Sequence, residues 1–528
     1  MASGNRSEWF VDARSAPWRV TGTGASVRSA RDEAHVVASR AAAPRNIPCA
    51  TRDRSTVESY GLMIRFGTSG WRAVLGEEFT FPNARRVVTA IARVTKASGN
   101  ISPDLVLASD TRFLNERFVD EAARVFVREG VRALRADRDV PTPVVAFTIR
   151  RLGAAGGVNF TASHNPPEFN GIKFSTADGA PALPDVTARI EAEIAKTTDA
   201  DAEPAPAAPA DTIEPRRPYL ERLATFVDTA ALREANLRVA VDPRFGTSRG
   251  YLDVFLKDAG VDVTLINGHR DPYFGGLSPQ CDEKNLAALA KVVVSEKRHL
   301  GLATDGDADR FGILDADGRY VDPNLCLMLL ADLLLGRRKG GDRRGVARSV
   351  ATTHGLDAVA KVHGAEVFTT PVGFKYIGEL LLKDAITIGG EESAGFTMAG
   401  HVPEKDGLLA GLLLAERVAT TGETLAGLLA ELFRRVGPFH PKRLDARLDS
   451  ALAAALKKRL TENPDTFAGL KVQSIDRTDG QKLELGDGRW ILFRPSGTEP
   501  VVRIYAESAD EKETDRLLEA AKKYVLQS

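Results

Sequence analysis

The sequence predicts an α/β protein built from three or four domains. Its 528 residues are too many for a single hydrophobic core. Short apolar runs typical of buried strands alternate with segments that have the apolar spacing of helices, which favours mixed α/β domains with largely parallel sheets. From about Gly437 the pattern changes to a smaller α+β unit. The repeats are architectural, because no strict sequence period accompanies them.

The expected elements follow one another in a regular order. A Pro/Ala-rich stretch at 199–209 indicates a linker near the end of the first domain. The strand–helix–strand rhythm recurs around Asp305 and again from 346 to 388. The clearest strands are predicted at 105–109, 237–242 and 261–266, and the clearest helices at 115–129 and 251–258.

Composition excludes several classes of function. Lys plus Arg and Asp plus Glu are 71 each, so no net charge recruits nucleic acid or an anionic membrane. The three cysteines, Cys49, Cys281 and Cys326, are too far apart for a disulfide framework or a zinc site, which indicates a reducing compartment. No apolar run approaches the roughly 20 residues that span a bilayer. We therefore expect a cytoplasmic protein.

Residues 1–62 differ from the rest of the chain. They are rich in Arg, Ala and Ser, lack a continuous apolar segment and show no clear periodicity. Acidic residues such as Glu8 and Asp12 argue against a transit peptide, which is usually poor in acid. We interpret this segment as a disordered extension, consistent with a start codon assigned upstream of Met63.

The most informative motif is Thr-Ala-Ser-His-Asn-Pro at 161–166. A strand-like approach precedes it and a Pro-Pro break follows it, so Ser163 is expected on a rigid, exposed turn. A serine hydroxyl is a weak nucleophile unless a base or a charged assembly activates it. His164 is adjacent, although neighbouring residues rarely face one another. Because a Ser-His pair in a turn is usually only a hydrogen-bonded loop, the interpretation depends on three motifs downstream.

The first downstream motif is Asp-Gly-Asp-Ala-Asp-Arg at 305–310. Carboxylates at alternate positions, Asp305, Asp307 and Asp309, can converge on one hard cation. An EF-hand is excluded, because its sixth position would be Arg310 and its twelfth Ala316. Three ligands with open positions suit Mg²⁺, which completes its shell with water or phosphate oxygens. A solvated acidic turn is the alternative for such a motif taken alone.

The other two motifs suit a sugar phosphate. Gly-Gly-Glu-Glu-Ser-Ala-Gly at 389–395 places carboxylates and a hydroxyl where they could bind vicinal sugar hydroxyls, although it could equally begin a capped helix. Lys405 follows closely enough to belong to the same site. Arg-Pro-Ser-Gly-Thr-Glu-Pro at 494–500, with Arg503 on the next strand, forms an anion-binding nest that can grip a phosphate without cleaving it.

These four motifs, in this order, resemble those of the α-D-phosphohexomutase superfamily, the phosphoglucomutases and phosphomannomutases. The resemblance runs from about Met63 to the C-terminus and includes Phe-Gly-Thr-Ser-Gly-Trp-Arg at 66–72 and Thr-Pro-Val-Gly-Phe-Lys at 370–375. It implies four domains around a central cleft, three related α/β domains and a smaller C-terminal α+β domain. We expect them at 63–212, 213–312, 313–435 and 436–528, with the phosphoserine, metal, sugar and phosphate loops respectively.

The resemblance also implies a role for each site residue. Ser163 is the residue that becomes phosphorylated, and it binds Mg²⁺ together with the three aspartates. The expected catalytic residues are Ser163, His164, Lys173 and Arg72. The expected metal ligands are Ser163, Asp305, Asp307 and Asp309. The expected substrate-binding residues are Arg310, Gly373, Glu391, Ser393, Lys405, Arg494, Ser496, Gly497, Thr498 and Arg503.

The expected reaction interconverts glucose 1-phosphate and glucose 6-phosphate. Phosphorylated Ser163, with about −1.5 to −2 charges, donates its phosphoryl group to give glucose 1,6-bisphosphate, the intermediate and activator, which turns and returns its other phosphate. A general base is required, and Lys173, His164 and Lys405 are all candidates. We expect hexose phosphates as the only partners of a monomer or homodimer.

Two other functions are less consistent with the motifs. A haloacid-dehalogenase phosphatase with Asp305 as nucleophile leaves Ser163 and Arg494 unexplained, and lacks the Thr or Val expected shortly after the second aspartate. A catalytically inactive sugar-phosphate sensor should have lost at least one key residue, and none is lost.

Among sugars, Glu391-Glu392-Ser393 resembles the glucose-preferring members. Enzymes acting on both glucose and mannose phosphates more often have Met in the middle and His where this chain has Gly395. Phosphomannomutase or dual activity is therefore the alternative.

Overall fold

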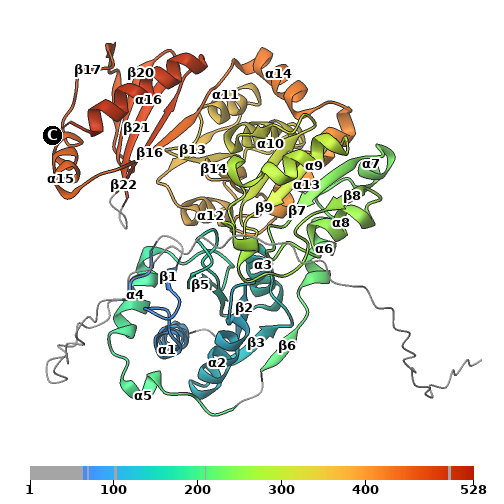
Figure 1. Cartoon of the computed structure of the whole chain (residues 1–528), viewed down its shortest axis with the longest axis vertical. Coiled ribbons are helices and arrows are strands. Elements are labelled where there is room, and N and C mark those ends of the chain that lie inside the picture. Colours follow the sequence, from blue (N-terminus) through green and yellow to red (C-terminus); the bar gives the residue numbers. More distant parts are fainter. Residues whose placement is uncertain (1–63, 68–69, 100–103, 208–209, 497–500, 528) are drawn as a thin grey trace, which may run out of the picture. The chain divides into compact units, whose positions relative to one another are not determined.

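A computed structural model describes residues 64–67, 70–99, 104–207, 210–496 and 501–527. The expected extension at 1–62 lies outside these residues. The chain divides into 1–62 and 63–528, and everything below concerns the second part (Figure 1). Among the described helices, none combines the length and apolar character that crossing a bilayer requires.

The first domain contains a six-stranded sheet in the order β1-β5-β4-β2-β3-β6. Its elements are β1 (Trp71–Val74), α1 (Phe81–Ala97), β2 (Asp104–Ser109), α2 (Asn115–Arg128), β3 (Arg132–Ala136), α3 (Thr142–Leu152), β4 (Gly156–Phe160), β5 (Phe169–Thr176), α4 (Pro184–Ile194), α5 (Asp199–Ala202) and β6 (Asp211–Ile213).

The second domain contains a five-stranded sheet in the order β11-β10-β9-β7-β8. Its elements are α6 (Arg216–Leu223), α7 (Thr229–Glu234), β7 (Arg238–Asp242), α8 (Leu252–Asp258), β8 (Asp262–Leu265), the 3₁₀ turns η1 (Phe274–Gly276) and η2 (Glu283–Asn285), α9 (Ala287–Ser295), β9 (Leu300–Thr304), β10 (Phe311–Asp315) and β11 (Tyr320–Val321).

The third domain contains a four-stranded sheet in the order β13-β12-β14-β15. Its elements are α10 (Pro323–Gly336), β12 (Gly345–Ser349), α11 (Gly355–Val362), β13 (Val367–Thr370), α12 (Phe374–Leu382), β14 (Ile386–Glu391), β15 (Gly395–Met398), α13 (Gly407–Thr421) and α14 (Leu425–Val436).

The C-terminal domain contains an antiparallel sheet in the order β16-β22-β21-β20-β19 and a small β17-β18 hairpin. Its elements are β16 (Lys442–Arg447), α15 (Ser450–Arg459), β17 (Thr466–Phe467), β18 (Leu470–Lys471), β19 (Ser474–Asp476), β20 (Gln481–Gly486), β21 (Arg489–Pro495), β22 (Val501–Glu507) and α16 (Glu511–Val525).

The first three sheets repeat one topology. The orders β5-β4-β2-β3, β10-β9-β7-β8 and β15-β14-β12-β13 are equivalent, with three parallel strands and one antiparallel strand at the end of each set. The expected architectural repeat is therefore present. It makes the β4–β5, β9–β10 and β14–β15 loops equivalent.

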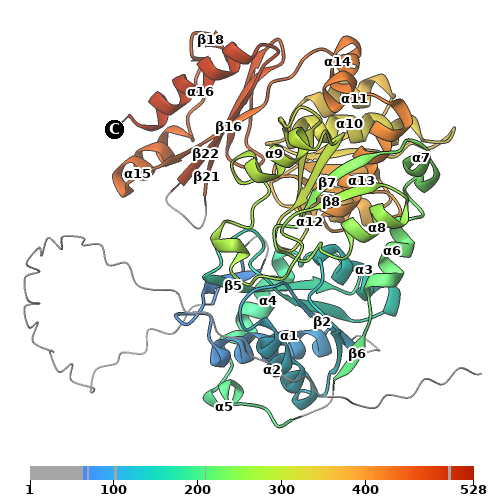
Figure 2. The ribbon, with the colours of Figure 1, turned by 45° about the vertical axis from the view of Figure 1, so that its right-hand side comes forward.

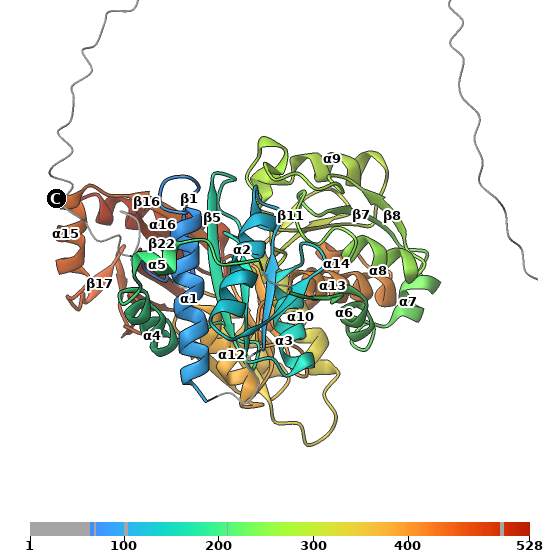
Figure 3. The ribbon, with the colours of Figure 1, turned by 90° about the horizontal axis from the view of Figure 1, so that it is seen from below.

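Both faces of these sheets are covered because successive residues of a strand point to opposite sides. In β2, Leu105 and Leu107 pack into the core with α1 and α2, whereas Val106 and Ala108 pack with α3. Seen from below, α1 and α3 lie on different sides of this sheet (Figure 3). The central strands therefore have the nearly continuous apolar sequence from which they were predicted.

Helices α10 and α13 belong to one core that the second and third domains share. Both helices are apolar around nearly their whole circumference, as expected for helices with no solvent-facing side. Each begins at an aspartate cap: Asp322 accepts a bond from Asn324 N, and Asp406 accepts bonds from Leu408 N and Leu409 N. Helix α13 contacts β9 and β10, so it supports the strands that carry the aspartate loop.

The structure corrects two expectations about the boundaries. The expected ends of the first two domains, at 212 and 312, fall inside β6 and β10, so the sheets extend to Ile213 and Val321. The stretch at 199–209 is not simply a linker. It begins with α5, whose Asp201 forms an ion pair with Arg93 at 2.7 Å, and Ala205 lies in the first core. Proline and alanine content alone did not reveal these contacts.

The C-terminal sheet also uses both faces. Ile491 and Phe493 pack with Leu517 of α16. Their neighbours Trp490 and Leu492 pack against Val350 and Ala351 of the third domain. Helix α16 is seen along the sheet in Figure 2. Because successive side chains of β21 point to opposite faces, one face of the sheet packs against α16 and the other packs against the third domain.

Candidate active site

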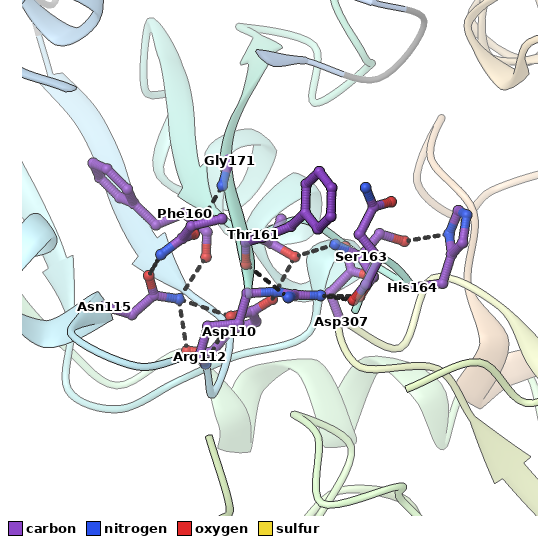
Figure 4. Close-up of polar contacts among 12 residues, drawn as sticks. Asp110, Arg112, Asn115, Phe160, Thr161, Ser163, His164, Gly171 and Asp307 are labelled. Atoms are coloured by element: carbon purple, nitrogen blue, oxygen red, sulfur yellow. Dashed lines mark hydrogen bonds and ion pairs between the residues drawn. The ribbon is translucent and has the colours of Figure 1, made fainter. Parts of the chain in front are cut away.

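The serine loop connects β4 to β5, and it meets the aspartate loop between β9 and β10. Ser163 Oγ donates to Asp305 Oδ2 at 3.0 Å. The same oxygen lies 3.3 Å from His164 Nδ1 (Figure 4). The expectation of an exposed serine is wrong: Ser163 is only 1% exposed, because the loop packs against the second domain. Its backbone has φ +53°, the left-handed conformation that a non-glycine residue adopts only when its surroundings impose it.

His164 faces the serine, although adjacent residues rarely do. Burial, together with the charges of Arg310 and Arg72, holds the pKa of His164 well below its usual range. A neutral imidazole can donate a hydrogen bond to the Ser163 oxygen or accept its proton, depending on which ring nitrogen carries the hydrogen. Arg72 on β1 donates to Asn165 Oδ1 at 3.0 Å and so reaches the same loop.

The three aspartates converge in the interior, which excludes a solvated acidic turn. Their carboxylate oxygens lie within 4.8 Å of one another, and all three residues are buried. Lys173 Nζ, from β5, donates to Asp307 Oδ2 at 2.6 Å and to Asp309 Oδ2 at 2.9 Å. Lys405 Nζ lies 3.2 Å from Asp309 Oδ2 and donates to Glu404 at 3.1 Å. Three domains thus contribute charge to one centre.

The cluster is electrically asymmetric. Burial, followed by the charges of Asp307 and Asp309, raises the pKa of Asp305 well above its usual range. Burial would also raise the pKa of Asp309, but Lys173, Lys405 and Arg310 outweigh it and hold that pKa well below its usual range. Burial would lower the pKa of Lys173, yet Asp307 and Asp309 outweigh it and raise that pKa. The lysines therefore compensate the negative charges of Asp307 and Asp309, while Asp305 lies beside Ser163.

The donor set fits a hard divalent cation. Asp307 Oδ1 and Asp309 Oδ1 are buried, and neither has a hydrogen-bond partner among the described residues. Unpaired buried carboxylate oxygens are costly unless a cation satisfies them. Oxygen-only ligands with room for a phosphate are what Mg²⁺ prefers. The residues present therefore fit the expected metal.

The sugar-loop residues lie between β14 and β15. Glu391 Oε1 accepts from Gly373 N at 2.7 Å, and Gly373 needs its φ of +134°, which favours glycine. Burial, followed by the charge of Glu392, raises the pKa of Glu391 to about 7. Ser393 lies in the same loop and is half-buried.

The middle residue of this loop turns toward protein. Glu392 Oε2 accepts from Ser349 Oγ at 3.1 Å and from Thr352 Oγ1 at 3.4 Å. At Gly395, an added Cβ would lie 2.7 Å from Lys405 Cδ. A larger residue there would displace Lys405, so Gly395 leaves the space that this lysine occupies.

The phosphate loop begins at the end of β21. Arg494 and Arg503 are directly opposite in the β21–β22 pair. Like charges placed opposite one another destabilise a sheet unless an anion or acid compensates them. Arg494 Nε donates to Asp479 Oδ2 at 2.8 Å, and Ser496 N donates to Val501 O at 2.8 Å. Gly497 and Thr498 lie outside the described residues.

Several supporting residues were not recognised from the sequence. Thr142 donates to Asp307 Oδ2 at 2.6 Å, and Asp479 also accepts from Val372 N of the third domain at 3.1 Å. Arg112 is buried beneath the serine loop. The Asp110-Thr111-Arg112 sequence at the end of a predicted strand was a visible signal for Arg112. Nothing local identifies Thr142 or Asp479.

Comparison with known proteins defines the class. Four sequence models match this chain: "Phosphoglucomutase/phosphomannomutase, alpha/beta/alpha domain I" at 63–201, domain II at 217–318, domain III at 322–436 and the C-terminal domain at 446–523. The chain therefore belongs to the phosphoglucomutase/phosphomannomutase family. It is an enzyme of the phosphohexomutase class, an intramolecular phosphotransferase.

Individual relatives match most of the chain but differ in the sugar they name. A phosphoglucomutase/phosphomannomutase of Thermococcus kodakarensis is 32% identical over 86% of this chain and 96% of its own length. A phosphoglucomutase of Komagataeibacter xylinus is 32% identical over 84% and 87%. A phosphoglucosamine mutase of Carboxydothermus hydrogenoformans is 31% identical over 86% and 97%. A solved Thermus thermophilus structure, named provisionally as a phosphomannomutase, aligns with TM-score 0.77 and 35% identity over 88% and 99%.

Proposed function

We propose that this protein is a phosphoglucomutase that interconverts glucose 1-phosphate and glucose 6-phosphate through a phosphoserine at Ser163. The observation that carries the proposal is the 3.0 Å contact between Ser163 Oγ and Asp305 Oδ2, beside carboxylate oxygens that accept no hydrogen bond from the described residues. A hydroxyl held against a charged cluster is the arrangement that an activated nucleophile requires.

In the first half-reaction, the bond between phosphorus and Ser163 Oγ breaks. A new bond forms between phosphorus and the free sugar hydroxyl, whose proton passes to a general base. Of the candidates His164, Lys173 and Lys405, His164 suits this role, because its lowered pKa keeps it neutral, whereas the raised pKa of each lysine keeps it protonated. The product is glucose 1,6-bisphosphate. After it turns, its other phosphoryl group returns to Ser163, and the proton returns to the sugar oxygen that is released.

The residues divide into three groups in this scheme. Asp305, Asp307, Asp309 and phosphorylated Ser163 would hold Mg²⁺, which when bound supplies positive charge to the transferring phosphoryl oxygens. Arg72, Arg310 and Lys173 supply further positive charge at the reacting end. Gly373, Glu391, Ser393 and Lys405 bind the sugar, and Arg494, Ser496, Gly497, Thr498 and Arg503 hold the phosphate that is not reacting.

Glucose is favoured over mannose by the sugar loop. Glu392 occupies the position that is more often Met in dual-specificity enzymes, and Lys405 occupies the space beside Gly395. Phosphomannomutase or dual activity is the second candidate, supported by the relatives that carry those names. One preparation assayed with glucose, mannose and glucosamine 1-phosphates should show the highest kcat/KM for glucose. An equal or higher value for mannose would favour the second candidate.

The nucleophile can be tested by replacing Ser163 with Ala. We expect turnover to fall by several orders of magnitude and phosphoserine to disappear from Ser163 in mass spectra. The matched control is Ser109→Ala, since Ser109 is another buried serine of the first domain, at the end of β2. That control should retain activity. Active wild-type enzyme without phosphoserine at Ser163 would contradict the mechanism.

A further inference from the structure

Arg112 lies beneath the serine loop and uses every N–H of its guanidinium group. Nε donates to Asp110 Oδ2 at 3.1 Å. The two terminal nitrogens each donate to two backbone carbonyls of the serine loop, at distances from 2.6 to 2.8 Å, namely those of Ser163, Asn165, Pro166 and Phe169. An arginine has five such donors, so none is left for a ligand.

The loop carbonyls are thereby turned inward toward one buried cation. Arg112 is 1% exposed, and its guanidinium lies 5.1 Å from the ring centre of Phe274 in the second domain. A second link runs through Thr161, whose hydroxyl donates to Asp110 Oδ2 at 2.6 Å and accepts from Ser163 N at 2.8 Å (Figure 4). The carbonyl of Ser163 is therefore bound directly to Arg112, and its N–H is bound to Asp110 through the hydroxyl of Thr161.

This arrangement explains why Ser163 keeps its unusual backbone conformation. A positive φ is unfavourable for serine, and it persists only where surrounding contacts impose it. With both backbone groups held, the side chain projects toward Asp305 and His164. The same oxygen must give a phosphoryl group in one half-reaction and receive one in the other, so its position matters in both.

We propose that Arg112 is a positioning residue for phosphoryl transfer, which fixes the direction of Ser163 Oγ without touching the substrate. The inference rests on the proposed role of Ser163. It predicts a defect in the transfer rate and not in the binding of the sugar phosphate, because the sugar and phosphate loops lie in other domains. Displacement of a reacting group by about 1 Å can lower a rate by about 100-fold.

The second domain contains a matched control. Asp242-Pro243-Arg244 lies at the end of β7 as Asp110-Thr111-Arg112 lies at the end of β2. In both cases the backbone N–H of the arginine donates to the aspartate. Arg244 is also 1% exposed, but its terminal nitrogens donate to the carbonyls of Ser278 and Asn285, outside the serine loop. Lysine at either position keeps the charge and offers at most three donors from a single atom.

The experiment compares Arg112→Lys with Arg244→Lys. We expect both to lower the melting temperature. Only Arg112→Lys should lower kcat by about 100-fold with little change in KM, and should slow single-turnover phosphorylation of Ser163 by added glucose 1,6-bisphosphate. Equal effects of the two substitutions on kcat, or normal phosphorylation in Arg112→Lys, would overturn the proposal.

A milder pair remains informative if the lysine variants do not fold. Thr161→Val is nearly isosteric and removes only the hydroxyl that joins Asp110 to Ser163 N. Thr148→Val removes an equally buried hydroxyl that bonds Val144 O within α3. Slower Ser163 phosphorylation in the first and not in the second supports the proposal, and equal rates oppose it. Absence of phosphoserine in the wild type would instead reject the function itself.

Discussion

The buried charged residues of this site depend on one another for their stability. Three buried carboxylates repel one another and lose hydration, which is costly unless cations and donors compensate them. Lys173 and Lys405 compensate Asp309, and Arg310 N donates to Asp305 Oδ1 at 3.1 Å. Two carboxylate oxygens, Asp307 Oδ1 and Asp309 Oδ1, still accept no hydrogen bond from the described residues. A bound cation would complete the set.

Replacing Asp307 with Asn should show this dependence. Oδ2 of Asp307 accepts from Thr142 and Lys173, while Oδ1 is free for the metal, so an amide can satisfy only one of these roles. We expect the Mg²⁺ concentration for half-activation to rise by at least about 10-fold. Replacing a residue that only hydrogen-bonds a metal ligand already lowers metal affinity by about this factor. Calorimetric titration with Mg²⁺ measures the same change without turnover.

The control for this substitution is Asp253→Asn. Asp253 is a buried aspartate of the second domain that accepts from Gly250 N at 2.6 Å, away from the metal loop. It should alter stability and leave the Mg²⁺ response intact. Full activity of the wild type in excess chelator would rule out the assigned role of the cluster.

At the scale of elements, particular residues at the end of the first central strand, or in the loop after it, contact the functional hairpin in each of the first three domains. After β2, Arg112 binds the serine loop. After β7, Thr247 N donates to Gly306 O of the aspartate loop at 3.0 Å. Ser349, the last residue of β12, and Thr352, in the loop after it, donate to Glu392 of the sugar loop. The repeated topology therefore repeats a mechanical role, although the residues that perform it differ.

The phosphate loop is tied to the sugar loop through one short path. Asp479 accepts from Arg494 Nε and from Val372 N, and the next residue, Gly373, donates to Glu391. Arg494 therefore starts a connection that ends at the sugar loop. A phosphate bound at Arg494 and Arg503 would replace repulsion across the β21–β22 pair with attraction.

We expect Arg494→Ala to raise KM and lower kcat/KM. Loss of one charge-assisted contact of about 1.5–3 kcal/mol corresponds to about 10- to 150-fold in kcat/KM. Slow phosphorylation of Ser163 by glucose 1,6-bisphosphate should persist, because the reacting end is held elsewhere. Release of free bisphosphate should increase, since the loosened intermediate escapes before it turns.

Arg489→Ala provides the comparison on the same strand. Arg489 lies at the opposite end of β21 and donates to Asp487 and Gly486 O, with no part in the phosphate loop. Its substitution should leave KM unchanged. If Arg494→Ala also left KM unchanged, the distal phosphate site would lie elsewhere.

At the scale of the whole molecule, the C-terminal domain is joined to the third domain by an apolar face with a polar cluster in it. Trp490, Leu492 and Tyr505 cover Val350 and Ala351. Within the same contact, Lys482 Nζ lies 2.7 Å from His354 Nε2 and 3.9 Å from the ring centre of Trp490. Glu507 accepts from both His354 N and Trp490 Nε1 at 2.9 Å.

This contact should make stability depend on pH. Burial, followed by the charges of Lys482 and Arg348, lowers the pKa of His354 to about 2. In the unfolded chain the same imidazole titrates near its ordinary value of about 6.5. Below that pH the unfolded state binds a proton that the folded state excludes, so stability falls as pH falls. Between pH 7.5 and pH 5 the loss amounts to about 2 kcal/mol.

His354→Gln isolates this contribution. Glutamine can accept from Lys482 through its carbonyl oxygen but does not titrate. Urea unfolding followed by tryptophan fluorescence should show a difference between wild type and variant that changes by about 2 kcal/mol over this pH range. The groups that face His354 are Lys482, Glu484, Glu507 and Arg348. Parallel pH profiles for the two proteins would contradict the prediction.

Local sequence determined the elements and the positions of the motifs. Apolar runs of strand length placed β2, β7 and β8 to within a residue or two. Gly- and Pro-rich turns placed the loops that carry Ser163, Asp305 and Glu391. These features depend on residues close together in the chain. The chemistry of each loop followed from its residue types, and the resemblance connected the loops to one reaction.

Only the tertiary structure decided how those loops act together. Ser163 and Asp305 are 142 residues apart, yet they share a hydrogen bond, and their burial follows from the contact between two domains. The five bonds of Arg112, the turn of Glu392 toward Ser349 and the path through Asp479 likewise join distant segments. Such contacts are set by packing and by the need to pair every buried polar group, and a local pattern contains neither.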